Sequence, residues 1–208
     1  MKEIAIEDNK RSPISWIPTL YFAMGMPFVV LNMVCTLMFK GLDVSDTQIA
    51  LWTSLIMLPW TLKPLWSPLL EIYKTKKFFV IITQISTGCI FGLVALALHL
   101  PHFFALSIAL LAVIAFCGAT HDVAADGYYM LELDSHEQSL FVGIRNTFYR
   151  IALIFGQGVL IALAGILQLY YRDMKAFTWS LVFYGMAGLF IAIYLYHSAF
   201  MPRPADDV

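Results

Sequence analysis

The sequence predicts an all-α polytopic membrane protein with six transmembrane helices. Hydrophobic residues make up 60% of its 208 residues and charged residues 13%, whereas about 25% of the residues in a soluble domain are charged. The mean hydropathy of the chain is +0.76. Apolar stretches of about 20 residues, the length that crosses a bilayer, recur between short polar connections. A single soluble core could not bury this much apolar surface, so a bilayer must cover part of it.

The first two expected spans are long enough to cross a bilayer, but prolines interrupt them. Proline removes a backbone donor and kinks a helix. At membrane depth, the freed carbonyl needs protein or water around it. These two spans are therefore expected either to line a polar cavity or to be tilted for packing. They cover about 16–39 and 47–70, with Pro27 in the first and Pro59, Pro64 and Pro68 in the second.

The other four expected spans are apolar runs bounded by short polar turns. The third follows the lysine-rich loop "EIYKTKK" and ends at the turn "HLPH". The connection "LELDSHEQS" separates the fourth span from the fifth, and "YRDMK" separates the fifth from the sixth. Connections this short join neighbouring antiparallel helices. The four spans cover about 78–99, 103–128, 140–165 and 176–199.

Lysine and arginine residues in the connections predict the orientation of the chain, because they accumulate on the cytoplasmic side. Seven fall on one side of the predicted bundle and three on the other. We therefore expect an inner-membrane protein with both termini in the cytoplasm. Its expected parts are a cytoplasmic tail at 1–15, the bundle at 16–200, and the start of a central cytoplasmic loop or a C-terminal tail at 201–208. The seven are Lys2, Lys10, Arg11, Lys74, Lys76, Lys77 and Arg203, and the three are Lys40, Arg172 and Lys175.

Charge and cysteine content argue against several other classes of protein. The net charge of −1 provides no basic surface for nucleic acid. The three cysteines, Cys35, Cys89 and Cys117, all lie in apolar runs, which argues against a disulfide framework or a metal site. The N-terminus has no short apolar region followed by a small-residue cleavage site, so a signal peptide is not expected. No cofactor, metal or nucleic acid partner is predicted.

The fourth span carries three ionisable residues in the stretch "HDVAAD", namely His121, Asp122 and Asp126. Ionisable groups within a membrane segment are costly and are functional candidates by default. The two aspartates are four residues apart, so they share one helix face, and both are expected near the cytoplasmic end of the span. Counted from the middle of the next connection, Arg145 lies at the depth of Asp126 and Arg150 at the depth of Asp122. Each acid is therefore expected to pair with an arginine.

Three interpretations of this cluster remain open. His121 and Asp126 have the H-x4-D spacing of glycerolipid acyltransferases, in which an aspartate orients a histidine base. The acids could instead form structural ion pairs at a cytoplasmic gate. In the third interpretation, a carboxylate exchanges protons or changes partners during transport, and His121 could itself titrate near neutral pH. Lys63, in the second span, is expected to extend to the membrane interface or to meet Glu71.

Four segments, in order, resemble the N-terminal half of AmpG-type muropeptide permeases and of the related acetyl-CoA transporters, which belong to the major facilitator superfamily. The segments cover most of residues 16–165. The resemblance implies a six-helix half of a major facilitator fold, whose substrate site is completed by a second half. The segments are "YFAMGMPF", "GLDVSDTQIALWTSLIMLPWTLKPLWSPLLEIY", "GATHDVAADGYYM" and "GIRNTFYRIALIFGQG".

Three motifs of that family are matched with changes. The K-x-L-W-A-P-x-x-D motif keeps its lysine, tryptophan and proline but has serine for alanine and glutamate for aspartate. The A-[TS]-Q-D-I-x-x-D motif keeps both aspartates but has histidine for glutamine. The G-Y-R motif keeps its tyrosine and arginine but has phenylalanine for glycine. The positions are Lys63, Trp66, Ser67, Pro68 and Glu71; Ala119, Thr120, His121, Asp122 and Asp126; and Phe148, Tyr149 and Arg150.

The expected function is secondary active transport without enzymatic activity, namely proton-coupled import of a muropeptide-like or other large polar solute by alternating access. The ionisable residues of the fourth span and the two arginines are the candidates for proton coupling or gating. The expected partners are a small-molecule solute, protons, the lipid bilayer and a second six-helix half from the same gene product or another chain. A non-transporting six-span partner or remnant, or less readily an acyltransferase, remains an alternative. Candidates for lining the pathway are Gly25, Pro27, Asn32 and Lys63.

Overall fold

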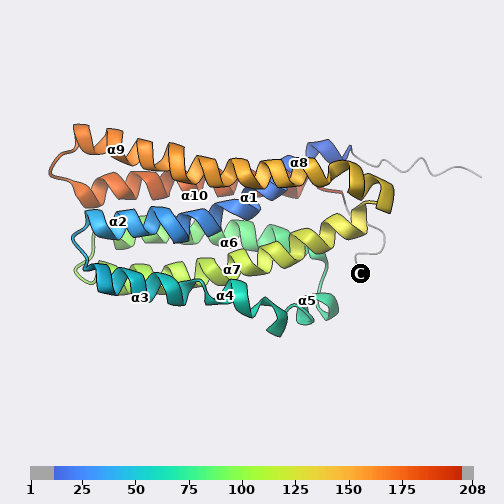
Figure 1. Cartoon of the computed structure of the whole chain (residues 1–208), viewed down its shortest axis with the longest axis horizontal. Coiled ribbons are helices and arrows are strands. Elements are labelled where there is room, and N and C mark those ends of the chain that lie inside the picture. Colours follow the sequence, from blue (N-terminus) through green and yellow to red (C-terminus); the bar gives the residue numbers. More distant parts are fainter. Residues whose placement is uncertain (1–11, 203–208) are drawn as a thin grey trace, which may run out of the picture.

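The computed structural model describes residues 12–202, and all regular secondary structure in this range is helical (Figure 1). Five helical stretches are long and apolar enough to cross a membrane. Their ends lie within about five residues of five of the six expected spans, as apolar length alone predicts. The five stretches are Pro13–Gly41, Lys76–Ala97, Phe103–Glu132, Ser135–Tyr170 and Lys175–Phe200.

Two of these stretches change helix type along their length. The first runs through a π-helical turn three residues after Pro27, which lies inside the helix without an N–H to donate. The fourth also contains a π-helical segment, although no proline causes it. The first stretch comprises η1 (Pro13–Ser15), α1 (Ile17–Val29), η2 (Val30–Val34) and α2 (Cys35–Gly41), and the fourth comprises α8 (Ser135–Ile154), η4 (Phe155–Leu160) and α9 (Ile161–Tyr170). The remaining three are single helices, α6 (Lys76–Ala97), α7 (Phe103–Glu132) and α10 (Lys175–Phe200).

The segment expected as the second span is not one continuous helix, and its breaks lie at the prolines that were expected to interrupt it. Pro59 lies in the first turn of one short piece, Pro64 lies in the next, and Pro68 directly precedes the last. Because each proline lacks an N–H, the ladder of helical hydrogen bonds cannot pass through them unbroken. A sixth membrane-spanning helix is therefore not confirmed. The pieces are α3 (Asp46–Ile56), α4 (Leu58–Leu62), η3 (Lys63–Leu65) and α5 (Leu69–Ile72).

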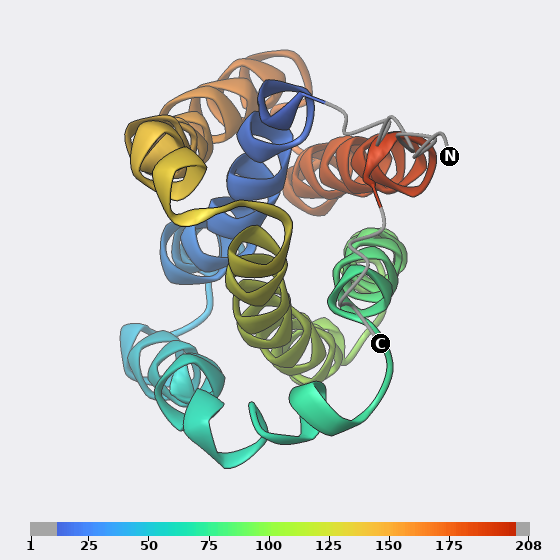
Figure 2. The ribbon, with the colours of Figure 1, turned by 90° about the vertical axis from the view of Figure 1, so that its right-hand side faces the viewer.

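Helix α7 lies at the centre of the bundle in a view along the long axis (Figure 2). It contacts α1, α3, α4 and α6, while α6 also contacts α10 and α1 also contacts α8. Both ends of the described chain lie at one end of the bundle, where the Tyr196 hydroxyl donates to the Ser15 carbonyl at 2.5 Å. The loop between α5 and α6 lies at that end as well (Figure 1). Four basic residues that predicted the orientation, Lys2, Lys10, Arg11 and Arg203, lie outside the described residues.

Polar caps explain where the two long helices α6 and α8 begin. The Thr75 hydroxyl accepts the Phe78 N–H at 3.0 Å at the start of α6. At the start of α8, the carboxylate of Asp134 accepts the Glu137 N–H, and the carboxylate of Glu137 accepts the Asp134 N–H in return. Such a capping box satisfies two backbone donors that the first helical turn leaves free.

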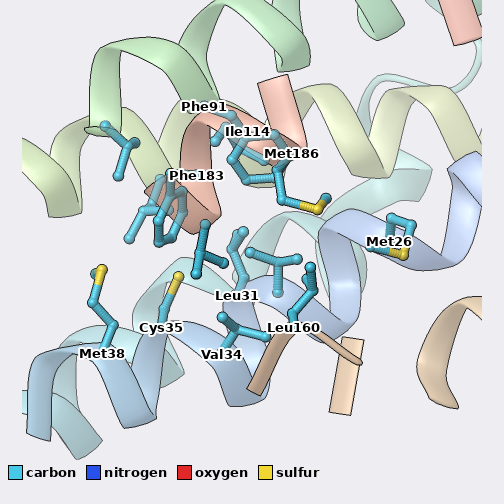
Figure 3. Packing of buried hydrophobic residues seen from close by; sticks show 14 of the residues in the cluster. Met26, Leu31, Val34, Cys35, Met38, Phe91, Ile114, Leu160, Phe183 and Met186 are labelled. Atoms are coloured by element: carbon cyan, nitrogen blue, oxygen red, sulfur yellow. The ribbon is translucent and has the colours of Figure 1, made fainter. Parts of the chain in front are cut away.

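The main apolar core joins all five long helical stretches and also includes residues of α3 (Figure 3). Aromatic rings interlock within it, and Phe91 of α6 lies 5.8 Å from Phe183 and 5.6 Å from Phe190 of α10 between ring centroids. In a bilayer, however, lipid is as apolar as this core, so helix association depends on close packing and on interhelical hydrogen bonds. The polar contacts around α7 therefore matter for the stability of the bundle. The labelled core residues are Met26, Leu31, Val34, Cys35, Met38, Phe91, Ile114, Leu160, Phe183 and Met186.

Candidate functional site

Three ionisable residues of α7 contact three different groups of neighbours. His121 and Asp122 are buried, with 4% and 6% of their surface exposed, and Asp126 is half-buried. All three lie in the second half of α7, near the end where the Tyr128 hydroxyl donates to the carbonyl of Pro202, the last described residue. Polar side chains from α1, α4, η3, α6 and α8 meet them there. The polar contacts of the bundle thus converge on its central helix.

Asp122 is bound by the broken segment that was expected to be the second span. Nζ of Lys63 lies 2.5 Å from Oδ2 of Asp122, and the indole N–H of Trp60 donates to the same oxygen at 3.0 Å. The expectation that Lys63 extends to the interface or meets Glu71 was therefore wrong. The breaks at the prolines allow η3 to approach α7, which a straight rod ending at the interface would not do.

Asp122 does not pair with Arg150, which corrects a second expectation. Arg150 is exposed, and the described part of the chain gives it no ion pair. Measured from Asp134, the residue that caps α8, Asp122 lies 12 positions before and Arg150 lies 16 positions after. The difference of four positions corresponds to about 6 Å along a helix. Lys63 therefore reaches the carboxylate, while Arg150 lies about one turn away from its depth.

The environment of Asp122 makes its charge costly. Its side chain is 8% exposed and that of Lys63 is 26% exposed. An isolated buried carboxylate costs several kcal/mol, and a close, hydrogen-bonded partner of opposite charge offsets much of that cost. Both donors bind Oδ2, whereas Oδ1 is buried and has no hydrogen-bond partner among residues 12–202. This unsatisfied oxygen can take up a proton or a new donor.

Asp126 pairs with Arg145, as predicted from their positions along the chain. The two side chains approach to 3.5 Å, and the Tyr21 hydroxyl donates to the same carboxylate at 2.9 Å. The Arg145 guanidinium also lies 4.8 Å from the ring centroid of Tyr21 and 5.0 Å from that of Tyr129. Because the Asp126 side chain is 41% exposed, the ion pair itself contributes about 0–1 kcal/mol. The aromatic contacts contribute at least as much, about 0.5–1 kcal/mol each.

His121 belongs to a buried hydrogen-bonded chain that crosses four helices. The side-chain amide nitrogen of Gln84 lies 3.0 Å from Nε2 of His121 and 2.9 Å from Nδ1 of His197. Nε2 of His197 lies 2.8 Å from the hydroxyl of Thr19, which donates to the Trp16 carbonyl at 3.2 Å. If the amide donates to both rings, each facing ring nitrogen is an acceptor and His197 donates from Nε2 to Thr19. In the same amide orientation, Oε1 of Gln84 lies 3.1 Å from Nδ1 of His197, and in the other tautomer of His197 this Nδ1–H donates to Oε1.

The proposed acyltransferase dyad is not present in the structure. His121 contacts Gln84 of α6, whereas Asp126 contacts Tyr21 of α1 and Arg145 of α8. Residues five apart on an α-helix point about 140° away from each other. No hydrogen bond joins His121 to Asp126 within the described chain, so the H-x4-D spacing does not assemble a base with its orienting acid.

The remaining motif residues lie at the end of the broken segment. Glu71 pairs with the buried Lys76 at 2.5 Å. The ring of Trp66 lies 4.9 Å from that of Phe116 on α7, and Pro68 is exposed directly before α5. These contacts attach the segment 63–72 to α6 and α7 at two points.

A cleft of about 410 Å³ lies beside the break in the second segment. Hydroxyl, amide and aromatic side chains from α1, η2, α3 and α4 line it, and none of the lining residues is charged. Asn32, one of the pathway candidates, lies on the π-helical turn η2, and such turns are frequent at functional sites. The lining residues are Phe28, Asn32, Thr53, Ser54, Met57, Trp60 and Thr61.

Two other pathway candidates are buried between helices. A Cβ atom at Gly25 would lie 2.9 Å from Cβ of Ala152, so the glycine allows α1 and α8 to approach closely. Pro27 is buried, and its Cβ would lie 3.1 Å from a Cβ atom at Gly118 of α7. Their surroundings are those of packing residues, whereas Lys63 and Asn32 lie beside polar groups and the cleft.

Sequence reasoning did not identify four residues of the site, namely Trp60, Tyr21, Gln84 and His197. A signal was available for Trp60, because it lies three residues before Lys63 and residues at that spacing share a helix face. No local spacing identifies the others, because their partners lie in distant parts of the sequence. His197 is 113 positions from Gln84, and Tyr21 is 105 positions from Asp126.

Comparison with known proteins gives two findings. The family model described as Major Facilitator Superfamily matches residues 19–207. A protein of Haemophilus influenzae, itself described as uncharacterized, is 30% identical over 180 residues. This match covers 84% of the chain and 40% of the Haemophilus protein. The chain therefore spans less than half the length of that relative.

Proposed function

The chain belongs to the major facilitator superfamily, and on that basis we propose that it is a six-helix half of a secondary active transporter that works by alternating access. Membership in the family supports transport of a small solute across a membrane in general terms. We take the segment 46–72 as the sixth crossing, interrupted at its prolines. Irregular backbone is tolerated at membrane depth where it is buried in protein or lines a water-filled cavity, and the cleft beside α4 supports this placement.

The ion pair between Asp122 on α7 and Lys63 on η3 is the observation that carries the proposal. Helix α7 has 30 residues and is about 45 Å long, which exceeds the hydrocarbon thickness of about 30 Å. If the hydrocarbon core is centred on the helix, Asp122 lies about 7 Å from the midplane and Asp126 about 13 Å from it. An ion pair at such a depth is a functional candidate by default.

Protonation of Asp122 is the proposed coupling step. A proton on the carboxyl group removes the charge that holds Lys63, and the segment that carries Lys63 can then separate from α7. Release of the proton restores the ion pair, and the segment that carries Lys63 returns to α7. Asp126 and Arg145 form a second, weaker contact near the end of the bundle, where they act as a latch. The ion pair between Lys63 and Asp122 is stable only while Asp122 is ionised. Binding of a proton therefore shifts the equilibrium towards the conformation in which the segment is separated from α7.

The proposed solute is muropeptide-like or another large polar molecule, and the proposed direction is import. The resemblance of four segments to muropeptide permeases supports this choice. We propose placement in the inner membrane with both termini in the cytoplasm, which the distribution of lysine and arginine favours. His121, which replaces the glutamine of the related permeases, is bound to Gln84 and is proposed to hold α7 against α6.

A second six-helix half, downstream in the same gene product or in another chain, is proposed to complete the transporter. The stretch Ser135–Tyr170 is the least covered of the five candidate spans, with 22% of its apolar window buried, so it offers surface to another bundle. The Haemophilus relative also extends well beyond the matched part. In folds of this kind, the solute binds at the interface between the halves.

The test is proton-driven uptake of labelled muropeptide by vesicles that contain the complete twelve-span assembly. The Asp122→Asn variant, which cannot ionise at this position, is expected to slow uptake strongly. Asp43→Asn is the matched control, because Asp43 forms an exposed ion pair with Lys175 in another part of the chain. Unchanged uptake in Asp122→Asn would contradict the coupling role, and absence of uptake in the wild-type assembly would favour a non-transporting partner.

A further inference from the structure

The side chain of Trp60 takes part in two sites at once. Its ring forms part of the wall of the uncharged cleft, and its indole N–H donates to Oδ2 of Asp122 at 3.0 Å. The indole is rigid, so its ring and its N–H group must move together. The position of one side chain therefore determines both the shape of the cleft and the number of donors that Asp122 receives.

The ring of Trp60 is held tightly against α7. A Cβ atom at Gly118 would lie 2.9 Å from Cζ2 of the indole, so only glycine leaves room for the ring at this point. The ring of Phe28 packs edge-on against it, with centroids 5.6 Å apart. A molecule that enters the cleft therefore cannot push the indole deeper into α7 without a clash. It must displace the indole sideways or move the short helix α4 that carries it.

The local backbone favours such a movement. Helix α4 has five residues and is bounded by Met57 on one side and by the 3-10 turn η3 on the other. Pro59 and Pro64 interrupt the helical hydrogen bonds on both sides of Trp60. Lys63 follows Trp60 by three residues, so a displacement of α4 alters both donors of Asp122.

We propose that Trp60 is the positioning residue through which occupation of the cleft is communicated to Asp122. The cleft accepts an uncharged, hydrogen-bonding part of the solute, and the displaced indole withdraws its donor from Oδ2, so the carboxyl group takes up a proton more readily. The transport consequence rests on the proposed function, whereas the link between Trp60 and Asp122 can be measured in the chain alone.

The chemistry of the cleft supports an uncharged occupant. The hydroxyl groups of Thr53 and Ser54 donate to the carbonyls of Ile49 and Ala50 at 2.7 Å, so their oxygens can still accept hydrogen bonds from a ligand. The amide of Asn32 offers both a donor and an acceptor. Sites that combine aromatic walls with a few such groups fix the orientation of ligands that carry amides or hydroxyls.

Few charged or titratable groups besides Lys63 lie close to Asp122 in the described chain. Lys63 contacts the same oxygen, Asp126 lies one turn further along α7, and Tyr149 of α8 lies close enough for electrostatic interaction. His121 is the neighbour in sequence and binds Gln84 instead. The Trp60 N–H is thus one of only two hydrogen bonds that the described chain provides to this carboxylate.

The first experiment measures modification of Asp122 by dicyclohexylcarbodiimide, which reacts with protonated carboxyl groups at membrane depth. The chain is reconstituted in lipid nanodiscs at constant pH, and the adduct at Asp122 is quantified by mass spectrometry. Trp60→Phe keeps an aromatic ring but removes the donor, and is expected to increase the labelling rate about tenfold, since a hydrogen bond to a charged group is worth at least that factor. Trp52→Phe is the matched control, because Trp52 is 40% exposed and does not line the cleft.

The second experiment fills the cleft covalently. In Asn32→Cys, benzyl methanethiosulfonate converts the thiol to a benzyl disulfide with loss of methanesulfinate, and the methyl reagent adds a much smaller group. The benzyl adduct is expected to increase labelling of Asp122 towards the level of Trp60→Phe, whereas the methyl adduct leaves it unchanged. The wild-type chain treated with each reagent controls for reaction at Cys89 and Cys117.

The inference is overturned if Trp60→Phe labels at the rate of Trp52→Phe, or if the benzyl adduct leaves Asp122 labelling unchanged. Equal thermal unfolding of Trp60→Phe and Trp52→Phe establishes that a change in labelling is not a loss of fold. Normal uptake by Asp122→Asn in the complete transporter, together with the expected labelling, would refute the proposed coupling role of Asp122 and leave the link between Trp60 and Asp122 intact. Slowed uptake by Asp122→Asn, together with unchanged labelling in Trp60→Phe, would refute only the role of Trp60.

Discussion

Removal of the lysine from the Lys63–Asp122 pair is expected to destabilise the bundle strongly. In Lys63→Met, the long apolar stem is kept, but a carboxylate with 8% side-chain exposure loses its charged partner. Breaking a buried ion pair costs about 3–5 kcal/mol. Because Lys63 is 26% exposed and Trp60 still donates to Oδ2, we expect a loss of about 2–4 kcal/mol in the free energy of unfolding.

The assay is equilibrium unfolding in mixed detergent micelles with increasing sodium dodecyl sulfate, followed by circular dichroism. Lys175→Met is the matched control, because Lys175 pairs with Asp43 at 2.8 Å but both side chains are at least 49% exposed, and such pairs contribute about 0–1 kcal/mol. The double variant Lys63→Met/Asp122→Leu removes both charges and is expected to recover most of the lost stability. A loss of stability in Lys63→Met no larger than that in Lys175→Met would refute this reasoning. A double variant whose loss equals the sum of the losses measured for Lys63→Met and Asp122→Leu alone would also refute it.

Two further variants test the packing and the polar network by the same unfolding assay. Gln84→Leu leaves two buried imidazoles without their shared partner and is expected to cost about 2–4 kcal/mol, whereas Gln157→Leu, at an exposed position of η4, should be near neutral. Equal losses in the two glutamine variants would contradict the network. Gly156→Ala places a methyl group against Val29 and is expected to cost about 1–3 kcal/mol, while Gly158→Ala meets no atom within 4 Å. A stable Gly156→Ala variant would show that α1 and η4 are less closely packed than described.

The helices of this chain were predictable because their cause is local. Apolar runs of about 20 residues and short polar connections located five stretches within about five residues of their observed ends. The second segment was not predictable in the same way, because Pro59 and Pro64 indicate a disturbance but not its extent. A transmembrane helix tolerates a single proline, as α1 tolerates Pro27. Three prolines within ten residues produced separate short helices instead.

The site was predictable only where its partners lie across a short turn. Asp126 and Arg145 are joined through the connection around Asp134, so counting from that turn predicted their contact. Asp122 was assigned to the wrong partner, because the position of Lys63 depends on how the broken segment folds back onto α7. The same limit applies to the hydrogen-bonded chain around Gln84, whose members come from four different helices.

The most direct test of proton coupling through Asp122 separates solute exchange from solute accumulation. Vesicles containing the complete transporter with Asp122→Asn are loaded with unlabelled muropeptide and supplied with labelled muropeptide, first without and then with a proton gradient. Coupling through Asp122 predicts that exchange continues at a measurable rate while the gradient no longer drives accumulation. Accumulation that responds to the gradient as it does in the wild type would contradict the role of Asp122.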